Sequence, residues 1–128
     1  MNTLKIVLPF PAEKLNPNRR GGRSWQATAD EKAEAVQMGK IATLDALKGK
    51  RPVIATPVKF SIAFYCPDRR RRDIDNLLAS LKPSLDGIAQ ATGIDDSVIE
   101  EMQLIKRYDD LSNPRVEINI PVMPPLGG

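Results

Sequence analysis

The sequence contains no histidine, and its single cysteine is Cys66. Histidine is the commonest general base at neutral pH and the commonest protein ligand of transition metals, so its absence excludes serine–histidine hydrolases, zinc deaminases and histidine-dependent nucleases. One cysteine forms no internal disulfide and offers no paired spacing for zinc, and we expect Cys66 to be a buried strand residue. A metalloenzyme with this composition must bind its metal through oxygen atoms, which suits hard cations such as Mg²⁺ or Mn²⁺.

Long hydrophobic runs are also lacking. No segment approaches the roughly 20 apolar residues of a membrane-spanning helix, and the first ten residues, MNTLKIVLPF, lack the cleavage site of a secretory signal. We therefore expect a cytoplasmic protein without a membrane segment. The 128 residues fit one domain over residues 1–128.

The modest net charge of +3 conceals a marked division of charge along the chain. Residues 1–72 contain 15 Lys or Arg and 6 Asp or Glu, whereas residues 73–128 contain 4 and 10. A basic surface beside an acidic cluster suits a metal-dependent enzyme that acts on a polyphosphate backbone, because cations hold phosphates and carboxylates hold the metal. An unremarkable solvated charge distribution is the alternative.

Hydrophobic periodicity predicts an α+β fold with elements in the order β-α-β-α-β-β, a mixed sheet of about four strands with two helices packed against it. A first strand alternates from Leu4 to Phe10 and ends at Pro9 to Pro11. Residues 13–26 read as a loop. A helix over residues 28–48 begins at a capping box formed by Thr28 and Glu31, and its predicted apolar face comprises Ala33, Val36, Ile41, Leu44 and Leu47.

The second half of the chain continues the pattern. A half-buried strand alternates from Val58 to Tyr65, and two more strands are predicted over residues 98–108 and 116–122. Between them a second helix is interrupted or kinked at Pro83 and ends at Gly93. Its predicted apolar positions are Leu78, Leu81, Leu85, Ile88 and Thr92. Residues 122–128 are expected to form a frayed tail.

An acidic pair follows four consecutive arginines where the second strand gives way to the second helix. In an extended segment residues two apart point to the same side, so Asp73 and Asp75 would present their carboxylates together. Like charges at this separation are unfavourable without a counter-charge, which a bound divalent cation supplies. The alternative is that one of the two aspartates only caps the second helix.

Asp95 and Asp96 form a second acidic pair after Gly93, a common turn sequence by itself. The chain makes one long excursion through the second helix and returns, and we expect this return to bring Asp96 beside Asp73 and Asp75. Three carboxylates then share one or two Mg²⁺, with Asp95 as a further candidate ligand. Two such metals stabilise both the attacking and the leaving oxygen in phosphodiester hydrolysis and need no histidine.

Lys82 follows Asp75 by seven residues and precedes Asp86 by four, so a regular helix places all three near one face. There Lys82 is a candidate for contact with the metal site or the scissile phosphate. The alternative is an ordinary surface salt bridge from Lys82 to Asp86, worth roughly a few tenths of a kcal/mol.

The run from Arg69 to Arg72 suggests phosphate clamps, because the planar donor fork of arginine matches phosphate better than lysine does. A solvated basic tract or a nuclear targeting signal is the competing interpretation. Trp25 is a candidate for stacking on an unpaired base, although a role in the core or in anchoring a loop is the commoner one.

The segment 69–109 resembles the centre of the RusA family of Holliday junction resolvases. The matching motifs are Asp73-Ile74-Asp75-Asn76-Leu77 after basic residues, Lys82 four residues before Asp86, and Asp95-Asp96-Ser97-Val98-Ile99. The opening MNTLKIVLPFPAEKLNPN is also similar to the first strand of the family and its proline-rich end. In the family the lysine usually stands four residues after the second aspartate, whereas Lys82 stands seven after Asp75, a shift of about 4.5 Å along a helix axis.

The resemblance implies a Mg²⁺-dependent crossover junction endodeoxyribonuclease, with Mn²⁺ as a substitute cation and no organic cofactor. It assigns the metal-binding and catalytic carboxylates to Asp73, Asp75 and Asp96 and the catalytic lysine to Lys82. It also implies a homodimer that grips four-way branched DNA and makes paired nicks in recombination and repair, often in phage or prophage genomes, hence in a bacterial or host cytoplasm. The predicted DNA-binding residues are Asn16, Arg19, Arg20, Arg23, Arg69, Arg70, Arg71, Arg72, Asn76, Lys106 and Arg107.

Two other functions remain open on the sequence. One is a non-catalytic accessory protein that binds branched DNA and uses its acidic residues only to cap helices. The other is a metal-dependent nuclease for flaps, replication forks or RNA. A panel of junction, fork, flap and duplex substrates separates the three.

Overall fold

The computed structural model describes residues 3–12, 15, 25–51 and 53–123, and the side chains of these residues except 25–28 and 96. The elements are β1 (Thr3–Pro9), α1 (Trp25–Leu47), β2 (Val58–Tyr65), α2 (Ile74–Thr92), η2 (Asp96–Val98), β3 (Ile99–Arg107) and β4 (Arg115–Pro121). Four strands and two helices in this order confirm the predicted α+β fold and its β-α-β-α-β-β sequence. None of the helices in the described ranges has the length and apolar character needed to cross a membrane.

The four strands form one mixed sheet in the order β1-β4-β2-β3. β4 pairs antiparallel with β1 and β2, whereas β3 runs parallel to β2. The parallel pair is joined through α2, as a parallel crossover requires. β3 is therefore an edge strand, and its register with β2 runs from Val58 opposite Ile99 to Tyr65 opposite Arg107.

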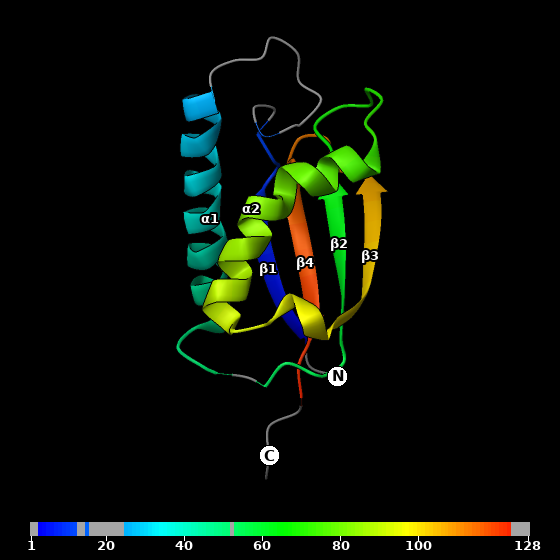
Figure 1. Cartoon of the computed structure of the whole chain (residues 1–128). Helices are drawn as coiled ribbons and strands as arrows, with labels where there is room; N and C mark the ends of the chain where they lie inside the picture. The colour runs from blue at the N-terminus through cyan, green and yellow to red at the C-terminus, as the bar shows by residue number, and fades with distance from the viewer. Residues whose placement is uncertain (1–2, 13–14, 16–24, 52, 124–128) are drawn as a thin grey trace.

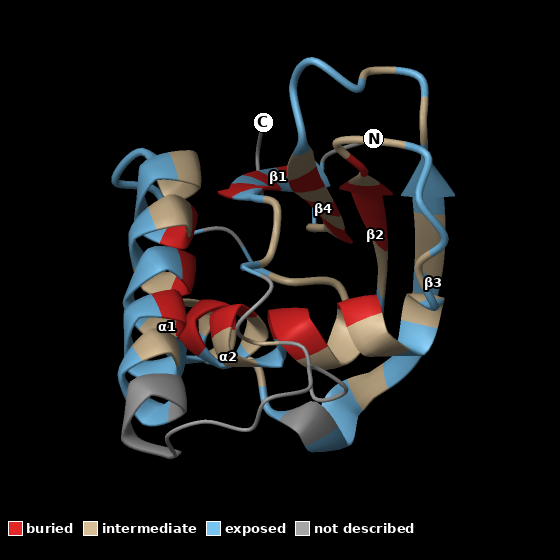
Figure 2. Cartoon of the chain, turned by 90° about the horizontal axis from the view of Figure 1, so that it is seen from above, coloured by how far each residue is buried: buried red, intermediate tan, exposed pale blue. Residues whose placement is uncertain are grey.

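Both helices lie on one face of the sheet (Figures 1 and 2). α2 begins at the end of the sheet where β2 and β3 terminate, crosses the helical layer beside α1, and ends near the opposite end of the sheet (Figure 1). The alternation in the strands explains which face the helices cover, because Leu4, Ile6 and Leu8 of β1 are buried while Lys5 and Val7 are exposed.

The core lies between the sheet and α2. Ile62 and Phe64 of β2 are fully buried there, together with Leu81 of α2. The remaining core residues come from all the central elements and include Leu4, Ile6, Leu8, Leu77, Ile88, Val116, Ile118 and Ile120. Burial of this apolar face is what fixes the start of α2 against the end of β2.

The two helices cross at a contact made of small residues. A Cβ atom on Gly39 of α1 would meet the carbonyl oxygen of Ser84, and one on Gly87 of α2 would meet the carbonyl oxygen of Val36. The Ser84 hydroxyl donates a 3.2 Å hydrogen bond to the carbonyl oxygen of Ala35 across the same contact. The backbones approach so closely that only glycine fits at these two positions.

This crossing corrects the predicted face of the first helix. The buried residues of α1 include Ala35, Gly39 and Thr43, whereas Ile41 and Leu44, two of the predicted core residues, are 63% and 57% exposed. The helix also starts at Trp25 rather than at residue 28. Thr28 therefore lies inside the helix and is not its N-cap, and Gln26 is helical rather than part of a loop.

Two smaller predictions also change. α2 runs from Ile74 to Thr92 without interruption at Pro83 and ends, as predicted, at Gly93, whose φ of 78° closes the helix. Cys66 is buried as expected but lies just beyond β2 rather than within it. Most of the predicted tail, residues 124–128, lies outside the described residues.

Candidate active site at the start of helix α2

The segment between β2 and α2 carries the arginine run and ends at the first acidic residue. Its start continues the sheet, because the backbone N–H of Cys66 donates a 3.0 Å hydrogen bond to the carbonyl oxygen of Arg107 in β3. Burial raises the pKa of the Cys66 thiol above its usual value, so the thiol stays protonated at neutral pH and is a poor nucleophile.

Asp68, just before the arginine run, holds two of its residues by hydrogen bonds. Its carboxylate accepts hydrogen bonds from the backbone N–H of Arg70 at 2.9 Å and from Nη1 of Arg72 at 2.8 Å. These bonds, with Arg72 contributing most, lower the pKa of Asp68 well below its usual range. The guanidinium of Arg72 also lies over the ring of Phe10, 5.5 Å from its centroid, so Arg72 is held by the residue that follows β1 and by its own loop.

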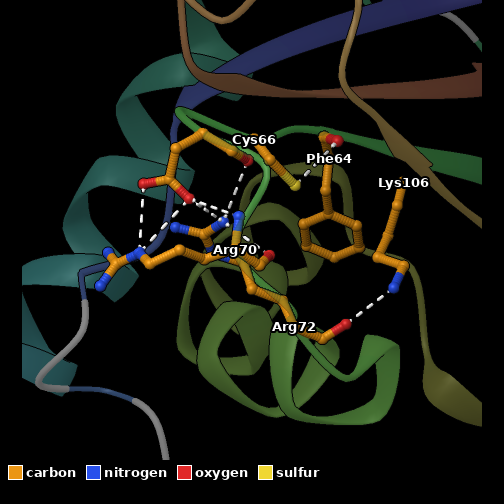
Figure 3. Close-up of polar contacts among 6 residues, drawn as sticks. Phe64, Cys66, Arg70, Arg72 and Lys106 are labelled. Atoms are coloured by element: carbon orange, nitrogen blue, oxygen red, sulfur yellow. Dashed lines mark hydrogen bonds and ion pairs between the residues drawn. The ribbon is translucent and has the colours of Figure 1, made fainter.

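Lys106 at the end of β3 holds the main chain of Arg72. Its Nζ donates a 2.7 Å hydrogen bond to the carbonyl oxygen of Arg72 (Figure 3). Arg72 is thus fixed through both its side chain and its backbone, immediately before Asp73. Arg69 and Arg71 are exposed and form no ion pair with any residue that the structure describes, so they remain available to an outside anion.

Asp73 and Asp75 lie in the first turn of α2. Asp73 is the N-cap residue, with an extended backbone (φ −81°, ψ 133°), and its side chain makes no capping hydrogen bond. The carboxylate of Asp75 accepts the backbone N–H of Asn76 at 3.0 Å. Both aspartates are exposed. The expectation that both stand in an extended segment is wrong, because Asp75 is already helical, and residues two apart in a helix do not face each other. That the two carboxylates meet at one metal stays a prediction.

The free carboxylate of Asp73 is informative because an N-cap aspartate normally accepts a backbone N–H of the next turn. The capping interpretation of Asp73 therefore lacks its hydrogen bond. The Asp73 carboxylate is exposed and has no partner among the residues that the structure describes, which suits a hard divalent cation, and Asp75 supplies a second oxygen donor in the same turn. These two residues fit a Mg²⁺ or Mn²⁺ ion as partial ligands.

An open cavity of about 500 Å³ lies beside this turn. It is lined by Phe10, Pro11, Ala12, Pro67, Arg70, Arg71, Arg72, Asp73, Asn76, Leu77 and Ser80. The cavity combines arginine side chains with one of the predicted metal ligands, which is the combination that a phosphodiester requires. The role of Asn76 in DNA binding stays a prediction.

Asp96 does not share this cavity. It opens η2, which leads into β3, and β3 starts beside Val58 at the far end of β2 from Cys66 (Figure 1). Eight residues of strand span roughly 25 Å. The chain therefore returns at the opposite end of the sheet, and the expectation that it brings Asp96 beside Asp73 and Asp75 is wrong within one chain.

The neighbouring Asp95 is exposed, and its carboxylate accepts the backbone N–H of Ser97 at 3.0 Å, which closes the turn before η2. Among the side chains that are described, no group of three histidine, cysteine, aspartate or glutamate residues comes together to hold a metal. The side chain of Asp96 is not one of them.

Lys82 lines a different cavity of about 310 Å³, together with Asp86 and with apolar residues such as Met102. It lies on the helix about 10.5 Å beyond Asp75 along the axis. No ion pair joins Lys82 to Asp86, although both residues are described, so the surface salt bridge is not formed. The catalytic role of Lys82 remains a prediction.

Sequence reasoning missed Asp68 and Phe10, which position Arg72. The spacing of Asp68 four residues before Arg72 was an available signal for the first. The other predicted DNA-binding residue in β3, Arg107, is exposed at the strand end. Four further predictions, Asn16, Arg19, Arg20 and Arg23, lie outside the described residues, as does the side chain of Trp25.

Comparison with known proteins adds to this geometry. The sequence model of the family described as Endodeoxyribonuclease RusA matches residues 9–121. The chain belongs to the RusA family. It is 33% identical over 109 residues to the crossover junction endodeoxyribonuclease rusA of Enterobacteria phage 82, covering 83% of this chain and 84% of that protein.

Two other relatives extend the comparison. The crossover junction endodeoxyribonuclease RusA of Escherichia coli strain K12 is 32% identical over 110 residues, with 83% of this chain and 84% of that protein covered. An uncharacterized protein of Xylella fastidiosa is 36% identical over 95 residues, which cover 71% of this chain but only 59% of that protein.

Proposed function

We propose that this RusA-family chain is a Mg²⁺-dependent endodeoxyribonuclease that resolves Holliday junctions by paired, symmetric nicks in recombination and repair. The activity printed for its phage 82 and Escherichia coli relatives gives the reaction class and the branched DNA substrate. The observation that carries the proposal here is that the carboxylate of Asp73 makes no helix-capping hydrogen bond. Asp73 lies in one helical turn with Asp75 and on the wall of a cavity lined by arginines.

Each residue of this turn has a role that follows from its position. The exposed Arg69 and Arg71 bind phosphates of the DNA backbone, and Arg72 is held rigidly at the cavity wall. Asp73 and Asp75 would hold the divalent cation. When bound, the cation would neutralise charge that develops on the phosphate during hydrolysis, and Mn²⁺ would replace Mg²⁺ with the same oxygen ligands.

The direct test is cleavage of a synthetic four-way junction by the Asp75→Asn variant. We expect Mg²⁺-dependent cutting to fall by at least about 100-fold, while junction binding in EDTA stays within a factor of two to three. Asp45→Asn, on the exposed face of α1, removes the same charge far from the turn and should cut normally. Unchanged cutting by Asp75→Asn would refute the proposed site.

A second function is that of a non-catalytic protein that binds branched DNA. That function predicts junction binding without nicks in either Mg²⁺ or Mn²⁺. Fork, flap, duplex and RNA substrates assayed in parallel show whether the four-way junction is the preferred substrate.

A further inference from the structure

We infer that Lys106 is a positioning residue for the carboxylate of Asp73, because its hydrogen bond to the carbonyl oxygen of Arg72 keeps Asp73 from capping helix α2. The inference rests on the proposed function, which makes Asp73 a metal ligand. It assigns Lys106 a contact inside the protein in place of the predicted DNA contact. It also accounts for an aspartate that stands at an N-cap position without a capping bond.

The register of the sheet brings Lys106 to the start of α2. Lys106 pairs with Phe64 of the parallel strand β2, and paired residues of neighbouring strands point to the same face of a sheet. Phe64 is fully buried in the core, so the side chain of Lys106 also leaves the sheet on the helix-covered face. It does so at the strand end where α2 begins, and its ammonium points at the carbonyl group of Arg72 (Figure 3).

The hydrogen bond from Lys106 is short and has a charged donor. Its Nζ lies 2.7 Å from the carbonyl oxygen of Arg72, at the short end of the range for an ammonium donor. The side chain of Arg72 is held separately, by the Asp68 carboxylate at 2.8 Å and by the ring of Phe10. Arg72 is therefore anchored on both sides of its Cα atom, from β3, from its own turn and from the residue after β1.

A fixed carbonyl group at Arg72 also fixes the backbone of Asp73. The peptide bond is planar, so the carbonyl oxygen of Arg72 and the backbone nitrogen of Asp73 move as one unit. The extended backbone of Asp73 is compatible with a cap, yet its carboxylate makes no capping bond and Asp73 lines the cavity beside Arg70 and Arg71. The orientation of the 72–73 peptide is what remains to decide between the two positions, and Lys106 holds that peptide.

The capping position becomes available to Asp73 if this peptide turns. An N-cap carboxylate accepts the backbone N–H of the second or third helical residue, which here are Asp75 and Asn76. The Asn76 N–H already donates to the Asp75 carboxylate at 3.0 Å, whereas the Asp75 N–H has no acceptor within the helix. Without Lys106 we expect the Asp73 carboxylate to accept the Asp75 N–H. A carboxylate used in this way has fewer oxygen lone pairs for a metal.

Hydrogen exchange of the Asp75 amide tests the inference without metal or DNA. In Lys106→Met we expect this amide, followed by NMR, to exchange roughly threefold more slowly than in the wild type, because the Asp73 cap protects it. If Lys106 only stabilised the start of the helix, the amide would exchange at the same rate or faster, and that result would overturn the inference. Lys106→Arg keeps a charged donor and should exchange like the wild type.

Mn²⁺ binding, followed by the electron paramagnetic resonance of the free ion, separates positioning from charge. Lys106→Met should weaken binding about 10-fold, as the loss of a group that orients a ligand does. Charge alone predicts the opposite sign, because removing a nearby cation favours a bound metal. Arg107→Met is the matched control, since it removes the same charge from the next residue of β3, which points to the other face of the sheet. It should bind Mn²⁺ at least as tightly as the wild type, and unchanged or tighter binding by Lys106→Met would overturn the inference.

Asp73→Asn separates a failure of the proposed function from a failure of the role of Lys106. If Asp73→Asn binds Mn²⁺ as tightly as the wild type, Asp73 is no metal ligand and the proposed site fails, while the exchange of the Asp75 amide still decides what Lys106 does. Junction binding in EDTA completes the comparison. Lys106→Met should bind within a factor of two to three of the wild type, whereas a loss of about 10-fold would indicate a phosphate contact and overturn the inference.

Discussion

The crossing of α1 over α2 and the turn from Cys66 to Asp73 fix the same helix at two places by different physical means. At the crossing, Gly39 and Gly87 bring uncharged backbones into direct contact. In the turn, the start of the helix is held by the Asp68–Arg72 ion pair and by the hydrogen bond from Lys106 to the carbonyl oxygen of Arg72, both of which involve solvent-accessible charged groups. Close packing is sensitive to volume and indifferent to pH, whereas the charged turn should show the opposite behaviour.

The largest expected effect comes from adding volume at the crossing. In an exposed helix, Gly→Ala stabilises by about 1 kcal/mol, but the methyl group in Gly87→Ala would collide with the carbonyl oxygen of Val36. Separation of the helices should outweigh the gain, and we expect a net loss of about 1–3 kcal/mol in the free energy of unfolding, measured by urea denaturation. Gln90→Ala, on the exposed side of α2, should leave stability within about 0.5 kcal/mol. A Gly87→Ala variant more stable than the wild type would show that the two helices can move apart at the crossing with little loss of stability.

This crossing also shows why part of the fold could not be predicted. The strands were predictable because alternation records a buried face directly, as in Leu4, Ile6 and Leu8. The contact face of α1 was not, because it consists of small residues such as Ala35 and Gly39, while larger residues such as Ile41 point to solvent. Apolar periodicity detects positions with large hydrophobic side chains. It does not detect a helix contact formed by glycine and alanine, where the backbones themselves touch.

The candidate site divides in the same way. Its local half was predictable, since Arg69 to Asp75 are contiguous and need only the junction of a strand and a helix. The position of Asp96 depends on strand direction, which periodicity does not contain. A helical crossover between parallel strands returns the chain to the opposite end of the sheet, so the parallel pairing of β2 with β3 separates the two acidic pairs.

A smaller effect, and one with a pH dependence, is expected at Asp68. Its folded-state pKa is lowered below the ordinary value of 3.8 by Arg72 and Arg70. A lowered carboxyl pKa contributes stability above the unfolded pKa and loses it as pH falls toward the folded pKa. Asp68→Asn should therefore lower the Tm at pH 7, and its difference from the wild type should shrink below about pH 4.

The matched control for that prediction is Asp45→Asn, which removes an exposed carboxylate from α1. Its Tm should follow the wild type across the same pH range. High salt should also reduce the effect of Asp68→Asn, whereas it should leave that of Gly87→Ala unchanged. An Asp68→Asn difference as large at pH 2 as at pH 7 would show that the turn is held by shape rather than by charge.

The smallest effect should appear where a charged group faces water on the open side of the sheet. Glu117 of β4 binds Arg115 at 2.7 Å and Lys5 at 3.4 Å, and Lys5 is 55% exposed whereas Arg115 is 19% exposed. Arg115 also stacks on Tyr65, 3.8 Å from the ring centroid. Lys5→Met should cost less than about 0.5 kcal/mol in urea denaturation, and Arg115→Met should cost clearly more, since it leaves the half-buried Glu117 without its main partner and raises the pKa of that carboxyl. Equal losses of unfolding free energy in the two variants would mean that the exposure of a charged side chain does not determine how much it stabilises this fold.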